Sequence, residues 1–481
     1  AGRIPQRDGQ APLAPRTGPC RRWLLLASPD LPQCVLYRVE QKRQQLQRLG
    51  CSVRQLWLAE LEDPAFSLNL LWADAVVVCR LAATASVLGA MAAARRFGLP
   101  LYYDIDDLLF DPQHCPPALA SYGGTLNPAQ HRRFALDVPL VVAAMAQADG
   151  VIVSTPTLAR RWAELATQAS ANVAVLPNLA PPELWPWADI PPQPRPGPLR
   201  LVLASGTTAH KQAWQQELAP ALARLLAVNP ALQLDLLGLV QVPQPLLAFA
   251  ERIRCRPYAN YGTYLRHLQK ASIGLVVLEP GIYTDAKSAI RWMEFSLLGL
   301  ASVLSPTATY LELLEDGRDA LFARGTEAWC RAVQRLIDEA PLRRARAARA
   351  HARACELFNP AQADSFWAPL LAAPPRPPRR RLLIINVFFA PQSIGGATRV
   401  VQDQVLQLLQ RAGDRYEVTV LCSDHIPWRL PEPLPATDEP DATNDAAATQ
   451  PTTPIAVDAH DWHGARVVRL STPLRPWPDP Y

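Results

Sequence analysis

The sequence predicts an α/β protein with two doubly wound lobes, a cleft between them, and the beginning of a third lobe of the same kind. Short apolar runs alternate with longer amphipathic runs, and this alternation starts three times along the chain. Proline-rich stretches at 181–198 and 373–380 separate the three series. Because strands that alternate with helices form βαβ units with right-handed crossovers, each series predicts a parallel sheet covered by helices.

The first series covers residues 21–180, after an N-terminal stretch (1–20) that we expect to be flexible because it is polar and contains proline. It predicts amphipathic helices at Tyr37–Leu49 and Ala82–Phe97. Its strands are expected at Trp23–Ala27, Val53–Leu58, Ala75–Cys79, Leu101–Asp104, Gly150–Ser154 and Val173–Pro177. Residues 181–198 contain many prolines, which continue neither a helix nor a central strand, and we interpret them as a hinge.

The second series covers residues 199–372, and residues 373–380 form a Pro/Arg linker behind it. Its strands are expected at Leu199–Ala204, Gln233–Leu237, Ile253–Pro257, Ile273–Leu278, Ala301–Ser305 and Ala320–Phe322. Two such lobes joined by a hinge predict a ligand in the cleft at the carboxyl ends of the strands.

The third series covers residues 381–481 and is short. Strands are expected at Leu382–Phe389, Glu417–Cys422 and Ala465–Leu470, with a helix at Thr398–Ala412. Residues 425–460 are rich in Pro, Ala, Thr and Asp, which predicts a disordered insertion or a long surface loop. A doubly wound domain needs more strands than these to cover its sheet. We therefore interpret this segment as the start of a second unit.

Composition excludes several classes of protein. Hydrophobic residues make up 49% of the 481 residues, yet no run of about 18 apolar residues predicts a membrane span. The net charge of +5 comes mostly from arginine, and the Arg343–Arg353 and Arg376–Arg381 runs lack the interleaved aromatic residues of a nucleic-acid surface. A loose attraction to anionic membranes stays open. The nine cysteines have no zinc-ligand spacing, which indicates that the protein is in a reducing cytoplasm. Within the cytoplasm, the protein could lie at the inner face of the membrane.

The most informative candidate site follows the strand expected at Ile273–Leu278. A loop that contains Glu279, Tyr283 and Asp285 leads into a helix expected to begin near Lys287 and Ser288. A helix N-terminus offers free N–H groups to a diphosphate, and Lys287 adds a full charge there and Ser288 a hydroxyl. Nearly two turns deeper, the carboxylate of Glu294 can accept both hydrogens of a ribose diol. The alternative is a surface helix with a capping serine.

A second candidate is the small-residue turn after the first strand of the same lobe. It comprises Ser205, Gly206, Thr207, Thr208, Ala209, His210 and Lys211. Small residues let backbone amides approach a phosphate closely, and His210 and Lys211 add side-chain donors. The turn matches neither GxGxxG nor GxxxxGK[ST], so neither a dinucleotide nor an ATP fingerprint is present. An ordinary strand-to-helix turn is the alternative.

In the first lobe, three acids lie at or just after the carboxyl end of the strand expected at Leu101–Asp104. Asp104 and Asp106 could hold a divalent ion as a DxD pair. Alternatively, Asp104, Asp106 and Asp107 could bind the acceptor or support catalysis. A helix cap at Asp107 is the third interpretation. Arg38 and Lys42 lie four residues apart on one helix face near the cleft, and Arg80 follows the third strand. They could contact an anionic acceptor or form a solvated surface.

These motifs together resemble the group 1 glycosyltransferases, retaining enzymes of the GT-B fold with two Rossmann-like lobes. The resemblance covers residues 21–372 and rests on YRVEQK, YYDIDD, ADGVIVST, VLPN, SGTTAHK and KSAIRWMEFSLLG, in that order. It implies a nucleoside-diphosphate sugar as donor, with Lys287 and Ser288 at the diphosphate and Glu294 at the ribose. It also implies that the first lobe supplies acceptor and catalytic groups, and that neither a metal nor another cofactor is needed.

The resemblance further implies transfer to a glycan or lipid-linked glycan in bacterial surface polysaccharide synthesis, such as O-antigen or capsule. One position departs from the family pattern: its Glu-x7-Glu pair would begin at residue 286, which is Ala286 here. Asp285 and Glu279 are out of register with that glutamate. A catalytically degenerate lobe pair that binds a glycan or nucleotide as a scaffold is therefore the alternative function.

The third segment resembles the opening of the same family, on NVFFAPQSIGGATRVVQDQVLQLL and YEVTVLCSD. In the family, the glycine loop that corresponds to Gly395 and Gly396 lines the cleft. The resemblance therefore implies a tandem arrangement, in which the N-terminal part of a second transferase follows the first.

Overall fold

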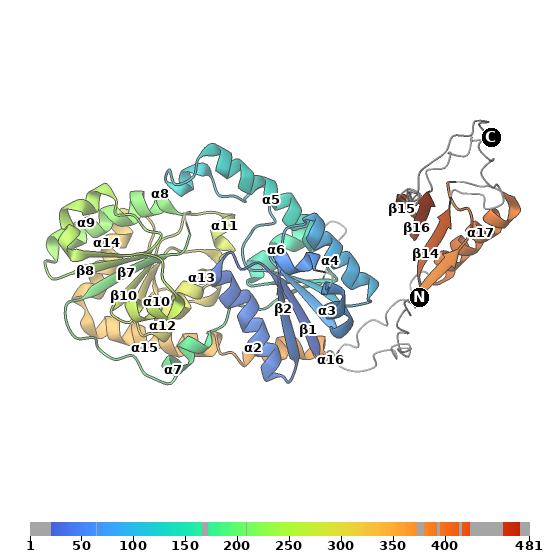
Figure 1. Cartoon of the computed structure of the whole chain (residues 1–481). Helices are drawn as coiled ribbons and strands as arrows, with labels where there is room; N and C mark the ends of the chain where they lie inside the picture. The colour runs from blue at the N-terminus through green and yellow to red at the C-terminus, as the bar shows by residue number, and fades with distance from the viewer. Residues whose placement is uncertain are drawn as a thin grey trace, which may run out of the picture. The chain divides into compact units, whose positions relative to one another are not determined.

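The computed structural model describes residues 21–63, 65–165, 172–207, 209–372, 380–391, 395–412, 416–423 and 456–471. The chain divides into two compact units, one of residues 1–95 and 99–376 and the other of residues 96–98 and 377–481 (Figure 1). Unit 1 contains two parallel six-stranded sheets, and unit 2 contains a four-stranded sheet. This arrangement confirms the predicted α/β fold class with a third, partial sheet.

The first sheet of unit 1 has the strand order β2-β1-β3-β4-β5-β6, and every pair is parallel. Its strands are β1 (Arg22–Ala27), β2 (Ser52–Trp57), β3 (Ala75–Cys79), β4 (Leu101–Ile105), β5 (Gly150–Val153) and β6 (Val173–Val175). The central strand β3 reads AVVVC and is buried throughout. A parallel strand covered on both faces needs such a continuous apolar run.

Helices connect these strands and cover the sheet. They are α1 (Pro32–Cys34), the π-helix η1 (Val35–Glu40), α2 (Gln41–Arg48), η2 (Leu58–Glu62), α3 (Phe66–Trp72), α4 (Ala85–Arg96), η3 (Leu119–Tyr122), α5 (Pro128–Ala146) and α6 (Pro156–Leu165). Asn127 caps α5 by accepting a hydrogen bond from the backbone N–H of Gln130. Such a cap satisfies a donor that the first turn leaves without a partner.

The second sheet has the order β12-β11-β10-β7-β8-β9 and is also parallel. Its strands are β7 (Arg200–Ser205), β8 (Gln233–Gly238), β9 (Ile253–Arg256), β10 (Ile273–Val276), β11 (Ala301–Leu304) and β12 (Leu321–Phe322). Its helices are α8 (Lys211–Ala213), the π-helix η5 (Trp214–Leu218), α9 (Ala219–Val228), η6 (Gln244–Arg252), α10 (Tyr261–Leu268), α11 (Ile282–Asp285), α12 (Ile290–Leu297), α13 (Ala308–Leu313), α14 (Thr326–Asp338) and α15 (Ala340–Leu357).

The connection between the lobes is partly helical, with η4 (Pro182–Leu184) and α7 (Trp185–Ala188). Arg195 fastens it to the second lobe by donating to the carbonyls of Gln269, Leu298 and Gly299. The chain then returns to the first lobe. Helix α16 (Gln362–Ala372), which the sequence assigned to the second lobe, packs Trp367 against Trp23, with ring centroids 5.3 Å apart.

Unit 2 contains β13 (Arg380–Ile385), α17 (Gly395–Ala412), β14 (Tyr416–Ser423), β15 (Ala456–Trp462) and β16 (Ala465–Ser471). Its sheet has the order β13-β14-β16-β15, and only the edge pair β15–β16 is antiparallel among its described strands. Gly395 and Gly396 are the first residues of α17, and Gly395 has a left-handed φ of 76°.

Strand β15 corrects the prediction of a loop over residues 425–460. Residues 424–455 lie outside the described part, but residues 456–460 belong to β15. His463 and Gly464 both have positive φ values, of 52° and 91°, and join β15 to β16. This two-residue turn, with φ above zero at both positions, suits the twist of an antiparallel hairpin. No helix in the described part of the chain is long and apolar enough to cross a membrane.

Candidate functional site

A cavity of about 950 Å³ lies between the two lobes of unit 1, at the carboxyl ends of both sheets. In the second sheet the strand order reverses between β7 and β10, and the segments after both strands line the cavity. Such a switch point is where open α/β sheets bind ligands. The predicted site residues on the cavity wall are Arg80, Asp106, Asp107, Ser205, Gly206, Thr207, His210, Lys211, Tyr283, Lys287, Ser288 and Glu294.

Lys287 and Ser288 lie in the short link between α11 and α12. The predicted helix start at these residues is corrected, because α12 begins at Ile290. The Nζ of Lys287 is 3.4 Å from Oδ1 of Asp107 in the other lobe and 5.0 Å from the ring centre of Tyr283. Burial opposes the charge of Lys287, but Asp107 raises its pKa above the ordinary value. Lys287 is therefore a cation at neutral pH.

The turn after β7 brings His210 and Lys211 to the same side of the cavity, where the His210 ring lies 6.3 Å from that of Tyr283. His210 is 6% exposed, and neither ring nitrogen has a hydrogen-bond partner among the described residues. Burial and the nearby Lys287 lower the pKa of His210 to about 3, so its ring is neutral at pH 7. Lys211 donates to the carbonyl oxygen of Leu239. Thr208 lies outside the described residues.

Glu294 lies on α12 at the far end of the cavity and is 2% exposed. Its Oε1 accepts a 2.9 Å hydrogen bond from the hydroxyl of Tyr37, which belongs to the first lobe. Its Oε2 accepts hydrogen bonds of 2.8 Å from the hydroxyl of Tyr264 and from Arg291. The carboxylate that the sequence assigns to a ribose diol is therefore held by three side chains from both lobes.

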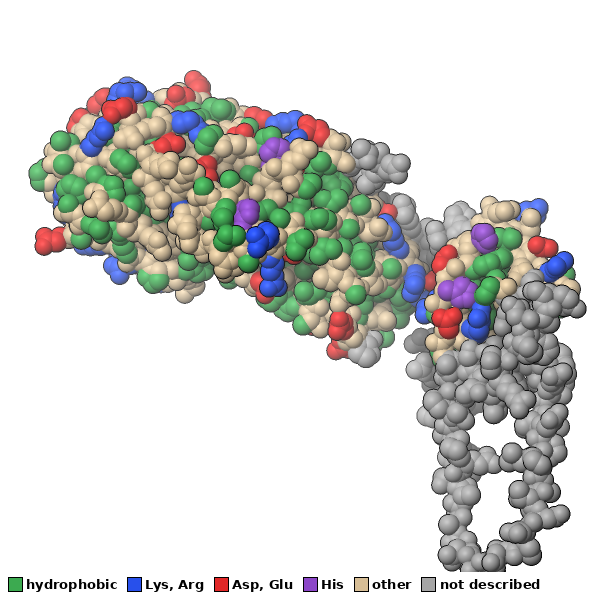
Figure 2. All heavy atoms as spheres, turned by 90° about the horizontal axis from the view of Figure 1, so that it is seen from above, with side chains coloured by type: hydrophobic (Ala, Val, Ile, Leu, Met, Phe, Trp, Pro, Cys, Tyr) green, Lys and Arg blue, Asp and Glu red, His purple; other side chains and the backbone are tan. Residues whose placement is uncertain are grey.

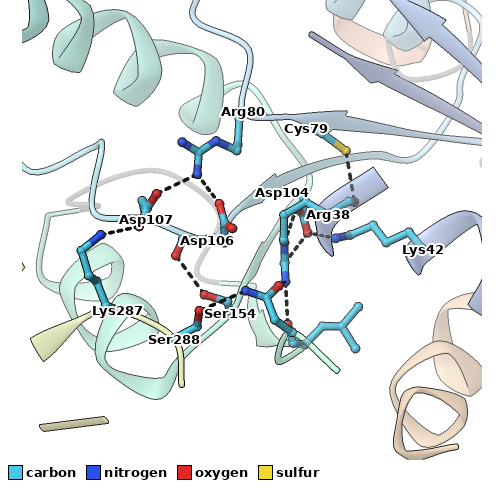
Figure 3. Close-up of polar contacts among 12 residues, drawn as sticks. Arg38, Lys42, Cys79, Arg80, Asp104, Asp106, Asp107, Ser154, Lys287 and Ser288 are labelled. Atoms are coloured by element: carbon cyan, nitrogen blue, oxygen red, sulfur yellow. Dashed lines mark hydrogen bonds and ion pairs between the residues drawn. The ribbon is translucent and has the colours of Figure 1, made fainter. Parts of the chain in front are cut away.

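Arg80 and two acids form the wall of the first lobe. Arg80 adopts a left-handed φ of 56°, and His210 on the facing wall has φ of 67°. Such values are uncommon outside glycine and tend to occur at functional sites. Arg80 pairs with Asp106 and lies 3.1 Å from Asp107 (Figure 3). Burial would raise the pKa of Asp107, but Lys287 and Arg80 hold it well below its ordinary value.

Asp104 and Arg38 do not line the cavity, which corrects two predicted roles. Asp104 is fully buried and pairs with Arg38 and Lys42, each at 2.6 Å (Figure 3). Strand β4 extends to Ile105, so Asp104 lies inside the sheet and only Asp106 and Asp107 follow its end. The predicted acceptor contact by Arg38 and the DxD metal pair both fail, because Asp104 is buried inside the lobe and is already paired with Arg38 and Lys42.

Glu279 and Asp285 are also absent from the described cavity wall. Glu279 accepts from the backbone N–H of Gln212, in the first turn after β7, and from the hydroxyl of Ser121 in the first lobe. Asp285 accepts from the backbone N–H of Ala308 and so caps α13. Both carboxylates are bound to backbone donors, and neither replaces the glutamate that is missing at Ala286. Ala286 is itself fully buried.

The backbone carbonyl of Ala286 accepts a 3.1 Å hydrogen bond from Thr155 in the first lobe. Ser288 accepts one of the same length from Asn178, which also accepts from Arg38. Together with the Lys287–Asp107 pair, these bonds mean that three consecutive residues of the second lobe contact the first. The link between α11 and α12 is thus held at the boundary of the lobes.

Sequence reasoning missed the aromatic side of the cavity. Tyr258, Tyr261 and Tyr264 follow β9 and line the wall near Glu294, with Tyr37 opposite. Their run, YANYGTY, stands directly after a strand, and that placement was the available signal. In the described residues, no group of three or more His, Cys, Asp or Glu side chains is arranged to hold a metal ion.

Comparison with known proteins agrees with this architecture. Residues 215–363 match the family model described as glycosyl transferase-like. Two solved structures have a TM-score of 0.51: sucrose-phosphate synthase from Thermosynechococcus elongatus, at 14% identity, and a glycosyltransferase from Rickettsia africae, at 12%. Each match covers 73% of this chain, and 100% and 99% of those chains. No match was found among the curated proteins. The second lobe therefore contains a glycosyl transferase-like domain, and unit 1 has the GT-B fold.

Proposed function

We propose that this protein is a retaining glycosyltransferase that moves a sugar from a nucleoside-diphosphate sugar to a glycan or lipid-linked glycan. The observation that carries the proposal is the position of Lys287 and Ser288 beside His210 at the switch point of a glycosyl transferase-like domain. A cation, a hydroxyl and a ring without a described hydrogen-bond partner there suit a diphosphate. The bacterial surface polysaccharide pathway is part of the proposal and rests on the sequence resemblance.

The chemistry follows from the charge that develops in the reaction. The bond between the anomeric carbon and the diphosphate oxygen breaks, and the bond to the acceptor oxygen forms. The leaving diphosphate gains negative charge as its bond breaks and takes up the proton that the acceptor hydroxyl releases. Lys287 stabilises that charge electrostatically, and the backbone amides of the turn after β7 add to it. Glu294 binds the ribose once it releases Tyr37. The first lobe supplies Asp106, Asp107 and Arg80 on the acceptor side of the cavity.

We propose no metal or other cofactor, because the cations of the site are protein side chains. The second candidate function is a non-catalytic scaffold that binds a nucleotide or glycan for a tandem transferase. The buried Ala286, in place of the acidic residue that the resemblance implies, favours this alternative. The two functions share the donor site, and they differ in whether bound donor is consumed.

The Lys287→Ala variant tests the proposal. We expect sugar transfer from UDP- or GDP-sugars to fall about 100-fold or more, because one preorganised charge at the leaving group is lost. Lys270→Ala is the matched control, since Lys270 is an exposed lysine of the same lobe. Wild-type transfer in the Lys287 variant would refute the assignment. If nucleotides raise the thermal midpoint of the wild type but no sugar is ever transferred, the scaffold function replaces it.

A further inference from the structure

A second, smaller cavity lies where the chain crosses between the two lobes of unit 1. Its volume is about 260 Å³, and we call it the hinge pocket. Its wall includes Leu179, Ala180 and Trp185 from the first crossing and Pro360 from the return crossing, together with one face of α2. The two crossings are bonded to one another there, because the N–H of Ala180 donates to the carbonyl oxygen of Phe358 at 3.1 Å. None of the residues that line the hinge pocket lines the larger cavity, so the two are separate.

Helix α2 presents a polar face to the hinge pocket. Its sequence, QKRQQLQR, places Gln41, Gln44, Gln45 and Arg48 three and four residues apart, and all four line the wall. Gln41 and Gln45 are only 4% and 5% exposed. Burial of an amide costs free energy unless its groups form hydrogen bonds, so both side chains need partners.

Only one of these two buried amides has partners at both of its ends. Nε2 of Gln41 donates to the carbonyl oxygen of Leu179, and its Oε1 accepts from the N–H of the same residue. Oε1 of Gln45 accepts a 3.0 Å hydrogen bond from Nε1 of Trp367, which is a donor only and therefore fixes the orientation of this amide. In the described part of the chain, Nε2 of Gln45 and the side-chain amide of Gln44 have no partner. The hinge pocket thus offers amide groups to a ligand.

Trp185 adds an aromatic ring to the wall. Figure 2 shows exposed hydrophobic side chains over much of one face of unit 1, so exposure alone does not mark a site. Trp185 is 42% exposed, and it differs because its ring is held in place: Nε1 donates a 2.8 Å hydrogen bond to the carbonyl oxygen of Ala180. Since the polar atom of the ring is bonded to the protein, the ring offers an apolar surface to a ligand.

The charge and the size of the hinge pocket restrict the class of ligand. Arg48 is the only charged residue on its described wall, and Arg48 pairs with Asp364 and donates to the carbonyl oxygen of Pro360. A phosphate or a carboxylate would need a free cation, so the wall favours a neutral ligand. Its volume is below the range of about 300–1,000 Å³ for pockets that hold drug-sized ligands. A single sugar ring is neutral and small, and it has both an apolar C–H face and a rim of hydroxyl groups.

We propose that the hinge pocket binds one neutral saccharide unit, which is either a free sugar or one unit of a glycan. The C–H face of the sugar ring packs on Trp185, and its hydroxyl groups bond the amides of Gln44 and Gln45. This site goes beyond the proposed function, because it takes no nucleotide and lies apart from the larger cavity. Since both crossings line the pocket, a bound sugar contacts both chain segments that join the lobes.

The test is saturation-transfer difference NMR of the 481-residue protein with glucose, galactose, mannose and N-acetylglucosamine, and with the methyl glycosides of these sugars. We expect a signal from at least one of them. Binding of a methyl glycoside assigns the pocket to a unit of a glycan, and binding of the free sugar alone assigns it to a monosaccharide. Trp185→Leu should raise the dissociation constant about tenfold, because apolar contact area is lost, and Trp185→Phe should keep most of the affinity. Gln44→Ala should raise the constant about threefold, through the loss of one hydrogen bond.

Matched controls come from the first lobe. Gln47→Ala changes an exposed glutamine of α2, and Trp72→Leu changes a half-buried tryptophan at the end of α3, and neither residue lines the hinge pocket. Both controls should bind sugar as the wild type does. The side chain of Gln44 bonds no described residue, so Gln44→Ala keeps the test decisive even where a tryptophan variant fails to fold. No signal from any of these sugars overturns the proposal, and so does a signal that is equal in the wild type, Trp185→Leu and Gln44→Ala. These measurements require no glycosyl transfer, so they stay separate from a failure of the proposed function.

Discussion

The two lobes of unit 1 begin with the same succession of elements, but the charged residues of these elements have different partners in the two lobes. After β1 the chain forms α1, the π-helix η1 and α2, and after β7 it forms α8, the π-helix η5 and α9. π-Helical turns are rare and occur mostly at functional sites. In the first lobe this helix sends Arg38 and Lys42 inward to Asp104. In the second lobe it begins at Lys211, which bonds only a carbonyl oxygen among the described residues.

The difference indicates which lobe has cations available to bind an anion. Arg38 and Lys42 of the first lobe share one buried carboxylate, Asp104, from their own sheet, so their charges serve the fold. In the second lobe, Lys211 and Lys287 lack a carboxylate partner from that lobe in the described residues, and the His210 ring has no described hydrogen-bond partner. The carboxylate near Lys287 comes from Asp107, across the cavity. A bound diphosphate would supply the negative charge that Lys211 and Lys287 lack from their own lobe.

The largest effect should come from removing the internal anion of the first lobe. Asp104→Asn preserves the shape of the side chain but leaves Arg38 and Lys42 buried without a counter-charge. Breaking a buried pair in this way typically costs about 3–5 kcal/mol, and we expect a loss of that size in the free energy of unfolding, measured with urea. Adding Lys42→Met to this variant should recover part of the loss, because one uncompensated cation is then gone.

The control for that prediction is Asp137→Asn, which neutralises an exposed acid of the same lobe. Its effect should stay within about 0.5 kcal/mol, as for most surface substitutions. If Asp104→Asn cost no more than this control, the charges of the first lobe would not be held by one another, and the contrast between the lobes would disappear.

An effect of intermediate size should appear in the pH dependence of stability, through His210. Its pKa is lowered to about 3 in the folded protein by burial and Lys287, while the unfolded chain has the ordinary value of about 6.5. The unfolded state therefore binds a proton that the folded state does not between these values, and stability falls as the pH drops below 6.5. At pH 5 the loss attributable to His210 is about 2 kcal/mol relative to pH 8.

His210→Asn isolates this contribution, because asparagine does not titrate and tolerates the left-handed backbone at this position. The loss between pH 8 and pH 5 should be smaller in the variant by about 2 kcal/mol. A nucleoside diphosphate should reduce the loss of stability at low pH in the wild type, because an anion beside the His210 ring raises its pKa. The charges of Lys287, Lys211 and Asp107 already act on this ring. Identical pH profiles of the two proteins would show that the ring is already hydrated or paired.

The sheets of unit 1 could be predicted from the sequence because buried parallel strands are continuous apolar runs. β3 was expected at its observed bounds, and most other strands differ by one or two residues at an end. β15 was missed, since AVDAHDW follows a long polar stretch and pairs only at an edge. The prediction for α16 failed for another reason: its return to the first lobe depends on the contact of Trp367 with Trp23, which are far apart in the sequence.

The site was predictable only where it follows the end of a strand. Lys287, Ser288 and His210 come after β10 and β7 and do line the cavity. The prediction that Asp104 faces the cleft was wrong, because β4 is one residue longer than expected and this acid therefore lies inside the sheet. Arg38 and Lys42 share a helix face, as their spacing indicated, but no local pattern shows whether that face points to solvent or to a buried acid. The tyrosines bonded to Glu294 come from separate elements, so only the fold brings them together.

The smallest effect should come from the hydrogen bond that ties the lobes together at Glu294. Oε1 of Glu294 bonds the hydroxyl of Tyr37, so a ribose must compete with the first lobe for that atom. Tyr37→Phe removes the competitor and keeps the aromatic ring. We expect the affinity for a nucleoside diphosphate to rise about threefold, measured by calorimetry, because a neutral hydrogen bond contributes about 0.5–1.5 kcal/mol.

Tyr264→Phe is the matched comparison, because it removes the same chemical group from the same carboxylate but within the second lobe. Its loss leaves Oε2 of Glu294 still held by Arg291, so the atom is not released for a ribose. Affinity should therefore rise in the Tyr37 variant and not in the Tyr264 variant. An equal rise in both would mean that the tyrosines act through the charge of Glu294 alone, whereas a fall in the Tyr37 variant would mean that this tyrosine contacts the ligand. The first result would remove the distinction between the lobes at this end of the cavity, and the second would extend the binding site into the first lobe.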